Sequence, residues 1–373
     1  MQTYIIQPGD TIDIIAVNFG TTVEEISYVN QIPYPYRLAV GQAILVQSEN
    51  VNFDKITRYS KGYAYPFISR YVLEQTLPYI SELLVFSYGF TVDGQIIYPS
   101  VDDGWMIEMA NVYDVRPILV LTPLGEDGRF DNGRIHTLLS NEIAVENLIA
   151  ELISIIELKG FSGVDVDFEY ILKEDNAAFT QFVARLTETL NNIGKKVSVC
   201  LAPKTSANQP GLLYEGKDYR GLGEAANEVL LMTYEWGYTY GPPMAVAPLN
   251  KVRQVIEYAL TEIVPEKICI GIANYGYDWK LPYVRGESKA VTIGNVEAVQ
   301  IAIRNDTAID FAPVSESPTF FYNEEGAEHE VWFEDVRSLR RKYDLISEYN
   351  LKGIGVWQLM RLYRAMWYEF YGK

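Results

Sequence analysis

One short run of the sequence alternates apolar with acidic side chains. It reads Phe161-Ser162-Gly163-Val164-Asp165-Val166-Asp167-Phe168-Glu169. Successive side chains of a β-strand point to opposite faces, so Asp165, Asp167 and Glu169 share one face and the apolar residues between them share the other. In a barrel of parallel strands the apolar face packs against the surrounding helices. We therefore expect the three carboxyl groups to point into the barrel.

The sequence around this run alternates strands with helices from Gly62 onward, which is typical of a parallel sheet with crossover helices. Helices are predicted at 142–159, 177–190 and 252–263. Predicted strands lie at 63–68, 83–90, 117–122, 163–169, 197–203, 229–234, 268–275 and 353–358. This pattern favours an α/β fold, a (β/α)8 TIM barrel over residues 59–373, with active-site residues at the strand C-termini. A doubly wound open sheet is the alternative, but no glycine-rich phosphate loop follows the first strand.

Two further segments extend this barrel. Residues 1–48 are predicted to form a separate strand–helix–helix–strand unit, in which Pro8-Gly9-Asp10-Thr11 makes a turn that ends in helix-capping chemistry. Residues 49–58 form a short linker that is not rich in glycine or serine, which favours a unit packed near the barrel. A small α+β insertion is expected between the seventh and eighth strands, at about 280–335, with strands at 319–322 and 330–333.

The charge balance limits the possible partners. The chain has 31 basic and 49 acidic residues and a net charge of −18. This charge argues against nucleic acid or an anionic membrane and favours a neutral ligand such as a glycan, although a solvated acidic surface would look the same. No segment is long and apolar enough to span a bilayer. The run from Met1 to Gly20 lacks a positive start and a continuous apolar core, so we expect no ordinary secretory signal.

Metal ions and other cofactors are not expected. Cys200 and Cys269 lie in apolar strand-like runs, which favours two buried thiols over a disulfide. His136 and His329 are too isolated to form a histidine-based site. The acidic run could hold a hard cation, but such sites usually draw oxygens from loops, and no second acidic cluster is evident. A solvent-facing acidic edge strand is the other alternative.

Crowded carboxyl groups have a chemical consequence. Like charges a strand step apart raise the pKa of at least one group, so one acid stays protonated near neutral pH. Glu169 is nearest to the C-terminal end of its strand, where substrates of barrel enzymes bind. It is therefore the candidate proton donor.

The run Ser162 to Glu169 resembles the DGxDxDxE signature of glycoside hydrolase family 18, the chitinase family, with Ser162 in place of the first Asp. The resemblance implies that Glu169 is the acid/base, that Asp167 stabilises the acetamide of the substrate, and that Asp165 is their inner electrostatic partner. In this family the acetamide oxygen is the nucleophile and the configuration is retained.

Other positions carry the resemblance further. Met232-Thr233-Tyr234-Glu235 resembles the family's M-x-Y-D, which implies that Tyr234 contacts the acetamide and that Glu235, one methylene longer, contacts the sugar. Trp357 is expected to form the floor beneath the reacting sugar, with a core tryptophan as the alternative. Met232 is expected to contact substrate with them. Further aromatic residues lie at or after predicted strand ends, and some of them should line the cleft: Tyr65, Phe86, Tyr88, Trp236, Tyr275 and Trp279.

Residues 1–48 resemble a LysM module, a family that binds N-acetylglucosamine-containing glycans between two loops. The resemblance rests on Tyr4, Pro8 to Thr11, Ile15-Ala16, Phe19 to Thr22, Ile26, Asn30 and Gly41-Gln42. The implied glycan-binding residues are Gly9, Asp10, Thr11, Ile12, Asn30, Gln31 and Ile32.

Nearly the whole chain is similar to the LysM-bearing spore cortex-lytic N-acetylglucosaminidases of spore-forming bacteria. The similarity is clearest at 204–209, 236–248, 275–282 and 329–335. It implies an enzyme of the spore coat or cortex or of the cell wall that cleaves the β-1,4 bond after N-acetylglucosamine. We expect a monomer. Muramic lactam has no acetamide, so the reacting sugar should be N-acetylglucosamine. A chitinase and a non-catalytic glycan-binding protein are the alternatives, and the presence of Glu169 weakens the second.

Overall fold

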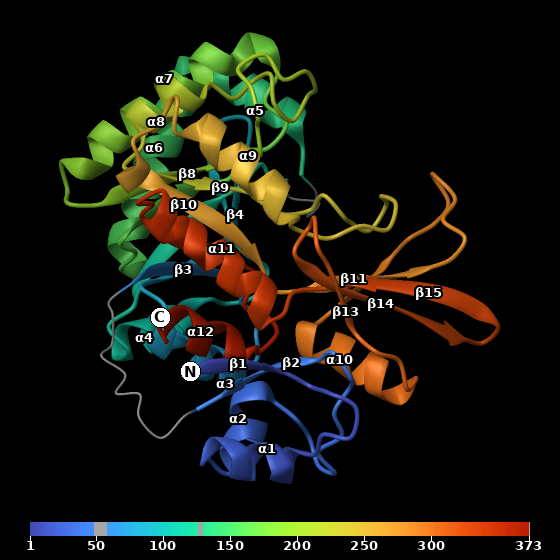
Figure 1. Cartoon of the computed structure of the whole chain (residues 1–373). Helices are drawn as coiled ribbons and strands as arrows, with labels where there is room; N and C mark the ends of the chain where they lie inside the picture. The colour runs from blue at the N-terminus through green and yellow to red at the C-terminus, as the bar shows by residue number, and fades with distance from the viewer. Residues whose placement is uncertain (48–57, 126–129, 373) are drawn as a thin grey trace.

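The computed structural model describes residues 1–47, 58–125 and 130–372. Across these residues, eight parallel strands form a closed barrel (Figure 1), which confirms the predicted fold. The last barrel strand pairs with the first and closes the ring. In spatial order the strands are β3 (Tyr59–Ala64), β4 (Glu82–Phe90), β6 (Arg116–Leu121), β7 (Gly163–Val166), β8 (Lys196–Leu201), β9 (Glu228–Leu231), β10 (Ile268–Ala273) and β16 (Gly353–Trp357).

Helices surround the barrel and follow most of its strands. The predicted helix 142–159 is α6 (Glu142–Lys159). It begins where the Asn141 side chain accepts hydrogen bonds from two backbone N–H groups, and it ends at Gly160, whose φ of 78° is left-handed. The other helices of the barrel are α3 (Arg70–Thr76), α4 (Gly104–Val112), α5 (Asn132–Leu139), α7 (Asn176–Asn191), α8 (Tyr219–Ala225), α9 (Leu249–Ala259), α11 (Val336–Glu348) and α12 (Arg364–Tyr371). None of the helices described here is both long and apolar enough to cross a membrane.

Short elements complete the barrel. The strand β5 (Ile96–Ile97) pairs antiparallel with the end of β4. Short 3-10 helices also occur among the described residues. They are η1 (Leu77–Tyr79) after α3, η2 (Lys173–Asp175) before α7 and η3 (Pro265–Lys267) before β10.

The predicted strand 163–169 is shorter in the structure. The ladder between β7 and β8 ends at the pair Val166 and Val199, although the Asp167 N–H still donates to the Leu121 carbonyl at 2.9 Å. The chain therefore leaves the sheet just before Glu169. The first barrel strand also begins earlier than predicted, because Ser60 and Lys61 lie inside it despite their polarity.

The insertion between β10 and β16 is a second, antiparallel sheet that projects from the barrel (Figure 1). It packs one face on α10 (Asn295–Arg304), and Ile293, Ala298, Phe320 and Val331 belong to their shared core. Its strands are β11 (Gly276–Lys280), β12 (Val291–Ile293), β13 (Asp310–Ala312), β14 (Ser317–Glu324) and β15 (Ala327–Trp332).

The N-terminal unit has the predicted order of elements. They are β1 (Gln2–Ile5), α1 (Ile12–Phe19), α2 (Val23–Asn30) and β2 (Ala43–Val46). The unit lies against α12 and α10 (Figure 1), and Val29 and Leu45 belong to the barrel core. The Ile309 N–H donates to the Val40 carbonyl at 2.8 Å. The unit is thus fixed on the barrel and the insertion. Of the predicted linker 49–58, only Arg58 lies within the described residues.

The contact of the N-terminal unit with the barrel and the insertion, here called the seam, can be tested at Gly41. A Cβ at Gly41 would overlap the carbonyl oxygen of Ile309, whereas a Cβ at Gly9 would meet nothing within 4 Å. Both glycines have left-handed backbones, with φ of 79° and 89°. Alanine at either position should therefore cost roughly 1–2 kcal/mol of strain. Gly41→Ala should cost about 1–3 kcal/mol more, through overpacking against Ile309. Urea unfolding measures both. Equal losses would contradict a packed seam.

Candidate active site

The strand β7 carries its carboxyl groups into the barrel. Asp165 is 0% exposed, Asp167 is 7% exposed, and Glu169 is half-buried just beyond the strand. Asp165 accepts hydrogen bonds from the Tyr63 hydroxyl at 2.8 Å and from the Ser198 hydroxyl. This places the acids in order of depth, with Asp165 deepest and Glu169 at the mouth.

A column of paired charges lies beneath Asp165. The Lys61 ammonium is 3.7 Å from an Asp165 oxygen and 2.9 Å from a Glu228 oxygen. The other Glu228 oxygen lies 3.0 Å from the Lys196 ammonium and 2.7 Å from the Lys352 ammonium. Burial would raise the pKa of Glu228, but these cations outweigh burial and hold that pKa well below its usual value. The buried charge of Asp165 is therefore compensated from below.

Asp167 and Glu169 have a different environment. Burial, followed by the charges of Glu169 and Asp165, raises the pKa of Asp167 well above its usual value. Burial also raises the pKa of Glu169; the charge of Glu235 adds to this effect and that of Lys217 opposes it. The Oδ1 atom of Asp167 is buried without a hydrogen-bond partner among the described atoms. Both carboxyl groups therefore keep a proton to higher pH than ordinary carboxyl groups do, and Asp167 can offer an oxygen to a bound group.

A hollow of about 390 Å³ with mixed polar and apolar walls opens on one side of Glu169. Tyr234 and Glu235, just beyond β9, form part of its wall. The Glu235 Oε1 atom accepts from the Tyr275 hydroxyl at 3.0 Å and the Tyr277 hydroxyl at 3.4 Å. The remaining lining residues are Tyr170, Pro203, Leu213, Tyr214, Met232, Trp236 and Tyr238.

A second hollow, of about 510 Å³, is lined by aromatic, aliphatic, proline and serine side chains among the described residues. Its inner wall is aromatic: Tyr65 and Phe86 make edge contacts with Trp357, with centroids 6.1 and 4.9 Å away. Trp357 and Tyr234 both pack against one cluster of buried residues that includes Ala273 and Tyr275. Phe67 and Phe130 extend the lining outward, with Pro66, Ser87, Pro99, Ser100, Val101 and Leu124. Aromatic faces of this kind suit the apolar face of sugar rings.

The family model described as glycosyl hydrolases family 18 matches residues 120–361, and the one described as LysM domain matches residues 4–47. The chain belongs to glycosyl hydrolases family 18. As a member of this family it is a glycoside hydrolase with an N-terminal LysM module.

Similar proteins cover almost the full chain. The cortical fragment-lytic enzyme of Bacillus subtilis (strain 168) is 33% identical, over 98% of this chain and 96% of the relative. The crystal structure of the Bacillus cereus spore cortex-lytic enzyme SleL has a TM-score of 0.82 and 30% identity, and covers 99% of this chain and 86% of that one. A chitinase from Chromobacterium violaceum ATCC 12472, 23% identical with a TM-score of 0.78 over 84% of this chain and 98% of its own, shares the fold.

Most residues that we predicted for the family 18 site lie around the carboxyl groups. Met232, Tyr234, Glu235 and Trp236 line the hollow beside Glu169. Tyr65 lies against Trp357, and Tyr275 reaches the site through Glu235. The aromatic residues that we did not predict are Phe67, Phe130, Tyr170, Tyr214 and Tyr238. They lie between the strands and helices. Phe67 and Tyr170 follow a strand within a few residues, whereas Phe130, Tyr214 and Tyr238 lie further along their loops, where no local pattern marks them.

Tyr88 lies elsewhere, which corrects our expectation that it lines the cleft. The pairing of β4 with β6 shifts register between Val85 and Tyr88, so Tyr88 points outward to the helices with Val85. Its hydroxyl donates to Asp103, and Lys159 lies 3.0 Å from that hydroxyl. Trp279 is also buried away from the cleft, where its indole N–H donates to the Gly241 carbonyl at 2.9 Å.

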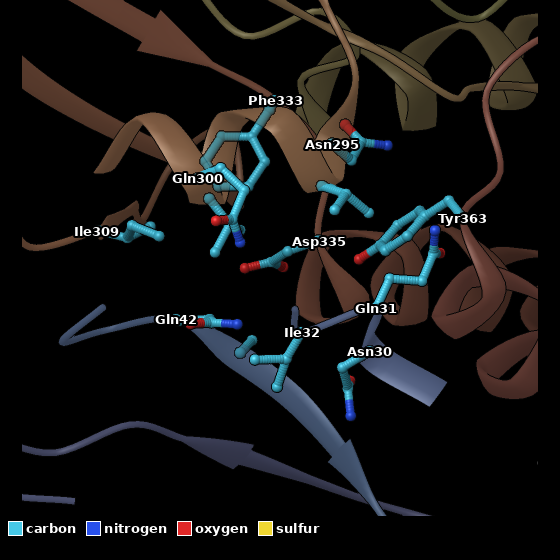
Figure 2. Close-up of a pocket in the computed structure, with 13 residues that line it drawn as sticks. Asn30, Gln31, Ile32, Gln42, Asn295, Gln300, Ile309, Phe333, Asp335 and Tyr363 are labelled. Atoms are coloured by element: carbon cyan, nitrogen blue, oxygen red, sulfur yellow. The ribbon is translucent and has the colours of Figure 1, made fainter. Parts of the chain in front are cut away.

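The predicted glycan-binding residues of the LysM module fall into two groups. Asn30, Gln31 and Ile32 line a small cavity where the module meets the insertion and the barrel (Figure 2). Gln31 donates to the Leu362 carbonyl at 3.1 Å and accepts from the Arg364 N–H at 2.8 Å. The loop that begins at Asn30, the second of the two predicted glycan-binding loops, is thus hydrogen-bonded to the barrel.

Within the module, several of these side chains hold the fold together. Asn30 bonds the backbone of Leu45 through both side-chain atoms, at 2.7 and 2.8 Å. Asp10 accepts from the Tyr4 hydroxyl at 2.8 Å, and Ile12 is buried. Gly9 and Thr11 are exposed, so the first loop is the more accessible one.

Within the residues that the structure describes, no group of three or more His, Cys, Asp or Glu side chains could hold a metal ion. Both cysteines are free and buried.

Glu235→Gln tests the electrostatics of the site. The glutamine keeps an acceptor for Tyr275 but removes a negative charge that raises the pKa of Glu169. A neighbouring anion disfavours the carboxylate, so its removal should lower the pKa of Glu169. Carbon-13 NMR titration of glutamate-labelled protein measures this pKa. As a control, Glu266→Gln also removes one negative charge, but at an exposed position before β10. It should leave the pKa of Glu169 unchanged. An unchanged value in Glu235→Gln would contradict the coupling.

Proposed function

We propose that this enzyme hydrolyses the β-1,4 bond after N-acetylglucosamine in spore cortex peptidoglycan, with the acetamide of the substrate as nucleophile. The observation that carries this proposal is the state of Asp167. A buried carboxyl group with a raised pKa and an unpartnered oxygen beside Glu169 suits the binding of an acetamide N–H. Asp165, held by Tyr63, Ser198 and Lys61, serves as the fixed charge behind Asp167.

Glu169 begins the reaction as a general acid. It donates its proton to the glycosidic oxygen, and the bond from that oxygen to the anomeric carbon breaks as the acetamide oxygen attacks the same carbon. Asp167 stabilises the positive charge of the resulting oxazolinium ion. Tyr234, whose raised pKa keeps its hydroxyl protonated, donates to the acetamide oxygen. Water then attacks the anomeric carbon while Glu169 takes its proton, and the bond from that carbon to the acetamide oxygen breaks. This step re-forms the acetamide, restores the acid and retains the configuration.

The substrate class follows from this chemistry and from the relatives. A sugar without an acetamide cannot supply the nucleophile, so muramic lactam is excluded at the reacting position. A cortical fragment-lytic enzyme and a spore cortex-lytic enzyme are similar over almost the whole chain, which supports cortex peptidoglycan. The same site chemistry would serve a chitinase, which is therefore the alternative to be tested.

We place the protein at the spore cortex or the wall, where the LysM module would add contacts to the same glycan. Gly9 and Thr11 are exposed, and they would contact the glycan directly. Asp10, Ile12, Asn30, Gln31 and Ile32 shape the loops around them. With a fixed seam between module and barrel, both sites would meet the glycan in one orientation.

Glu169→Gln should abolish the acid step. Loss of a positioned general acid costs roughly 10²–10⁴-fold in rate. Intact cortex, cortical fragments and chitin oligomers are digested in parallel, and released reducing ends are counted. Glu266→Gln, exposed and remote, is the matched control. Equal product from Glu169→Gln and wild type would refute the mechanism, and cleavage of chitin oligomers alone would identify a chitinase.

The acetamide requirement is tested on the substrate. Oligomers that carry glucosamine at the reacting position, in place of N-acetylglucosamine, lack the nucleophile and should not be cleaved. Mass spectrometry of products from matched acetylated and deacetylated oligomers gives the result. Cleavage after glucosamine at a comparable rate would instead favour a nucleophilic or water-activating carboxylate.

A further inference from the structure

Lys217 is a buried lysine that the reaction described above does not use. It lies in the loop between β8 and α8 and is only 1% exposed. Lysine is rarely buried to this extent unless its charge is paired or well hydrogen-bonded. No carboxylate oxygen within 4.0 Å of its ammonium group is found among the described residues. Its burial therefore needs another explanation.

The ammonium group lies where β7 and β8 separate. The ladder between these strands ends at Val166 and Val199. Beyond it, Lys217 donates to the carbonyl of Phe168, the residue before Glu169, and to the carbonyl of Cys200 on β8 at 3.0 Å. Its charge also lies over the Phe179 ring of α7, 5.0 Å from the centroid. The side chain thus joins the two strand ends where the sheet no longer does so.

The segment that carries Lys217 is held at a second point. The Lys204 ammonium donates to the Lys217 carbonyl at 3.0 Å, and the Tyr219 hydroxyl donates to the Ala202 carbonyl. A Cβ at Gly216 would overlap the Ile171 carbonyl, so the chain passes close to the loop after Glu169. The position of the ammonium is therefore defined from both sides.

We propose that Lys217 is a positioning residue for the proton donor. It fixes the backbone at Glu169 through the Phe168 carbonyl, and it keeps one positive charge behind Asp167 and Glu169. The proposal deepens the proposed function and rests on it, because it assigns a role to Lys217 only if Glu169 is the acid.

The charged and titratable groups around this ammonium are few. Asp167 and Glu169 face it from β7 and its end, and Cys200 faces it from β8. Glu235, after β9, acts on Glu169 from the other side of the hollow. Burial lowers the pKa of Lys217, and the carboxylates oppose this effect. The charge of Lys217 in turn lowers the pKa of both Asp167 and Glu169.

The test compares the pH dependence of kcat and KM for Lys217→Met, Lys217→Arg and Lys204→Met on soluble chitotetraose. Lys217→Met removes the charge, so both carboxyl groups should titrate at higher pH and both limbs of the kcat profile should move upward. Loss of the backbone contact should lower kcat by roughly 100-fold with little change in KM. Lys217→Arg keeps the charge, so its limbs should stay at the wild-type pH while kcat falls.

Lys204→Met is the matched control, since it loosens the same segment. Its charged neighbours are Asp218 and Glu262, and it should leave the limbs unmoved. The proposal would be overturned if the kcat–pH profile of Lys217→Met kept the wild-type limbs. It would also be overturned if the limbs shifted along the pH axis in Lys217→Arg or Lys204→Met.

Carbon-13 NMR titration of Glu169 in wild type and Lys217→Met needs no turnover and should give a raised pKa in the variant. A wild type that fails to cleave chitotetraose and cortical fragments refutes the proposed function, whereas an unchanged NMR titration refutes the effect of Lys217 itself.

Discussion

Asp165 is a carboxylate buried at the centre of a barrel, and its compensation is the constraint on which the site depends. An ion in such a place costs several kcal/mol unless partners replace its water. Tyr63 and Ser198 supply hydrogen bonds, and Lys61 supplies charge. Lys61 is itself compensated by Glu228, which is held by Lys196 and Lys352 near the barrel floor. The polar column from the floor to Asp165 therefore belongs to the active site as much as to the core.

This column explains how the three carboxyl groups of β7 and its end can have different roles in the reaction. Asp165 has its own partners, Tyr63, Ser198 and Lys61, whereas Asp167 and Glu169 lie above it, toward the mouth of the barrel. Burial raises the pKa of both, which suits one group to proton donation and the other to binding an acetamide. Lys217 and Glu235 act on Glu169 with opposite signs. The chemistry that we propose thus depends on side chains from β3, β7 and β8 and from the loops after β8 and β9.

Local patterns in the sequence were enough to predict much of this. The alternation over residues 161–169 placed the carboxyl groups on the inner face, and apolar spacing with caps gave α6 at its observed bounds. Tyr88 was misplaced because a register shift against β6 reverses the alternation, and a partner strand is not visible in a local pattern. Lys61 and Lys217 were missed because a polar residue in a strand or loop looks exposed until its distant partners are known.

The LysM module shows the same limit. Turn and cap residues predicted its four elements, but the contacts of Gln31 with residues more than 300 positions away could not be inferred from spacing.

The reducing end of the product tests the central claim most directly. Cortical fragments are digested, the products are reduced with borohydride, and the terminal alditol is identified by mass spectrometry. We predict N-acetylglucosaminitol, because N-acetylglucosamine brings its own nucleophile to Asp167 and Glu169, whereas muramic lactam brings none. A terminal muramitol would mean that the enzyme cleaves after muramic acid, and it would contradict the assignment of N-acetylglucosaminidase specificity.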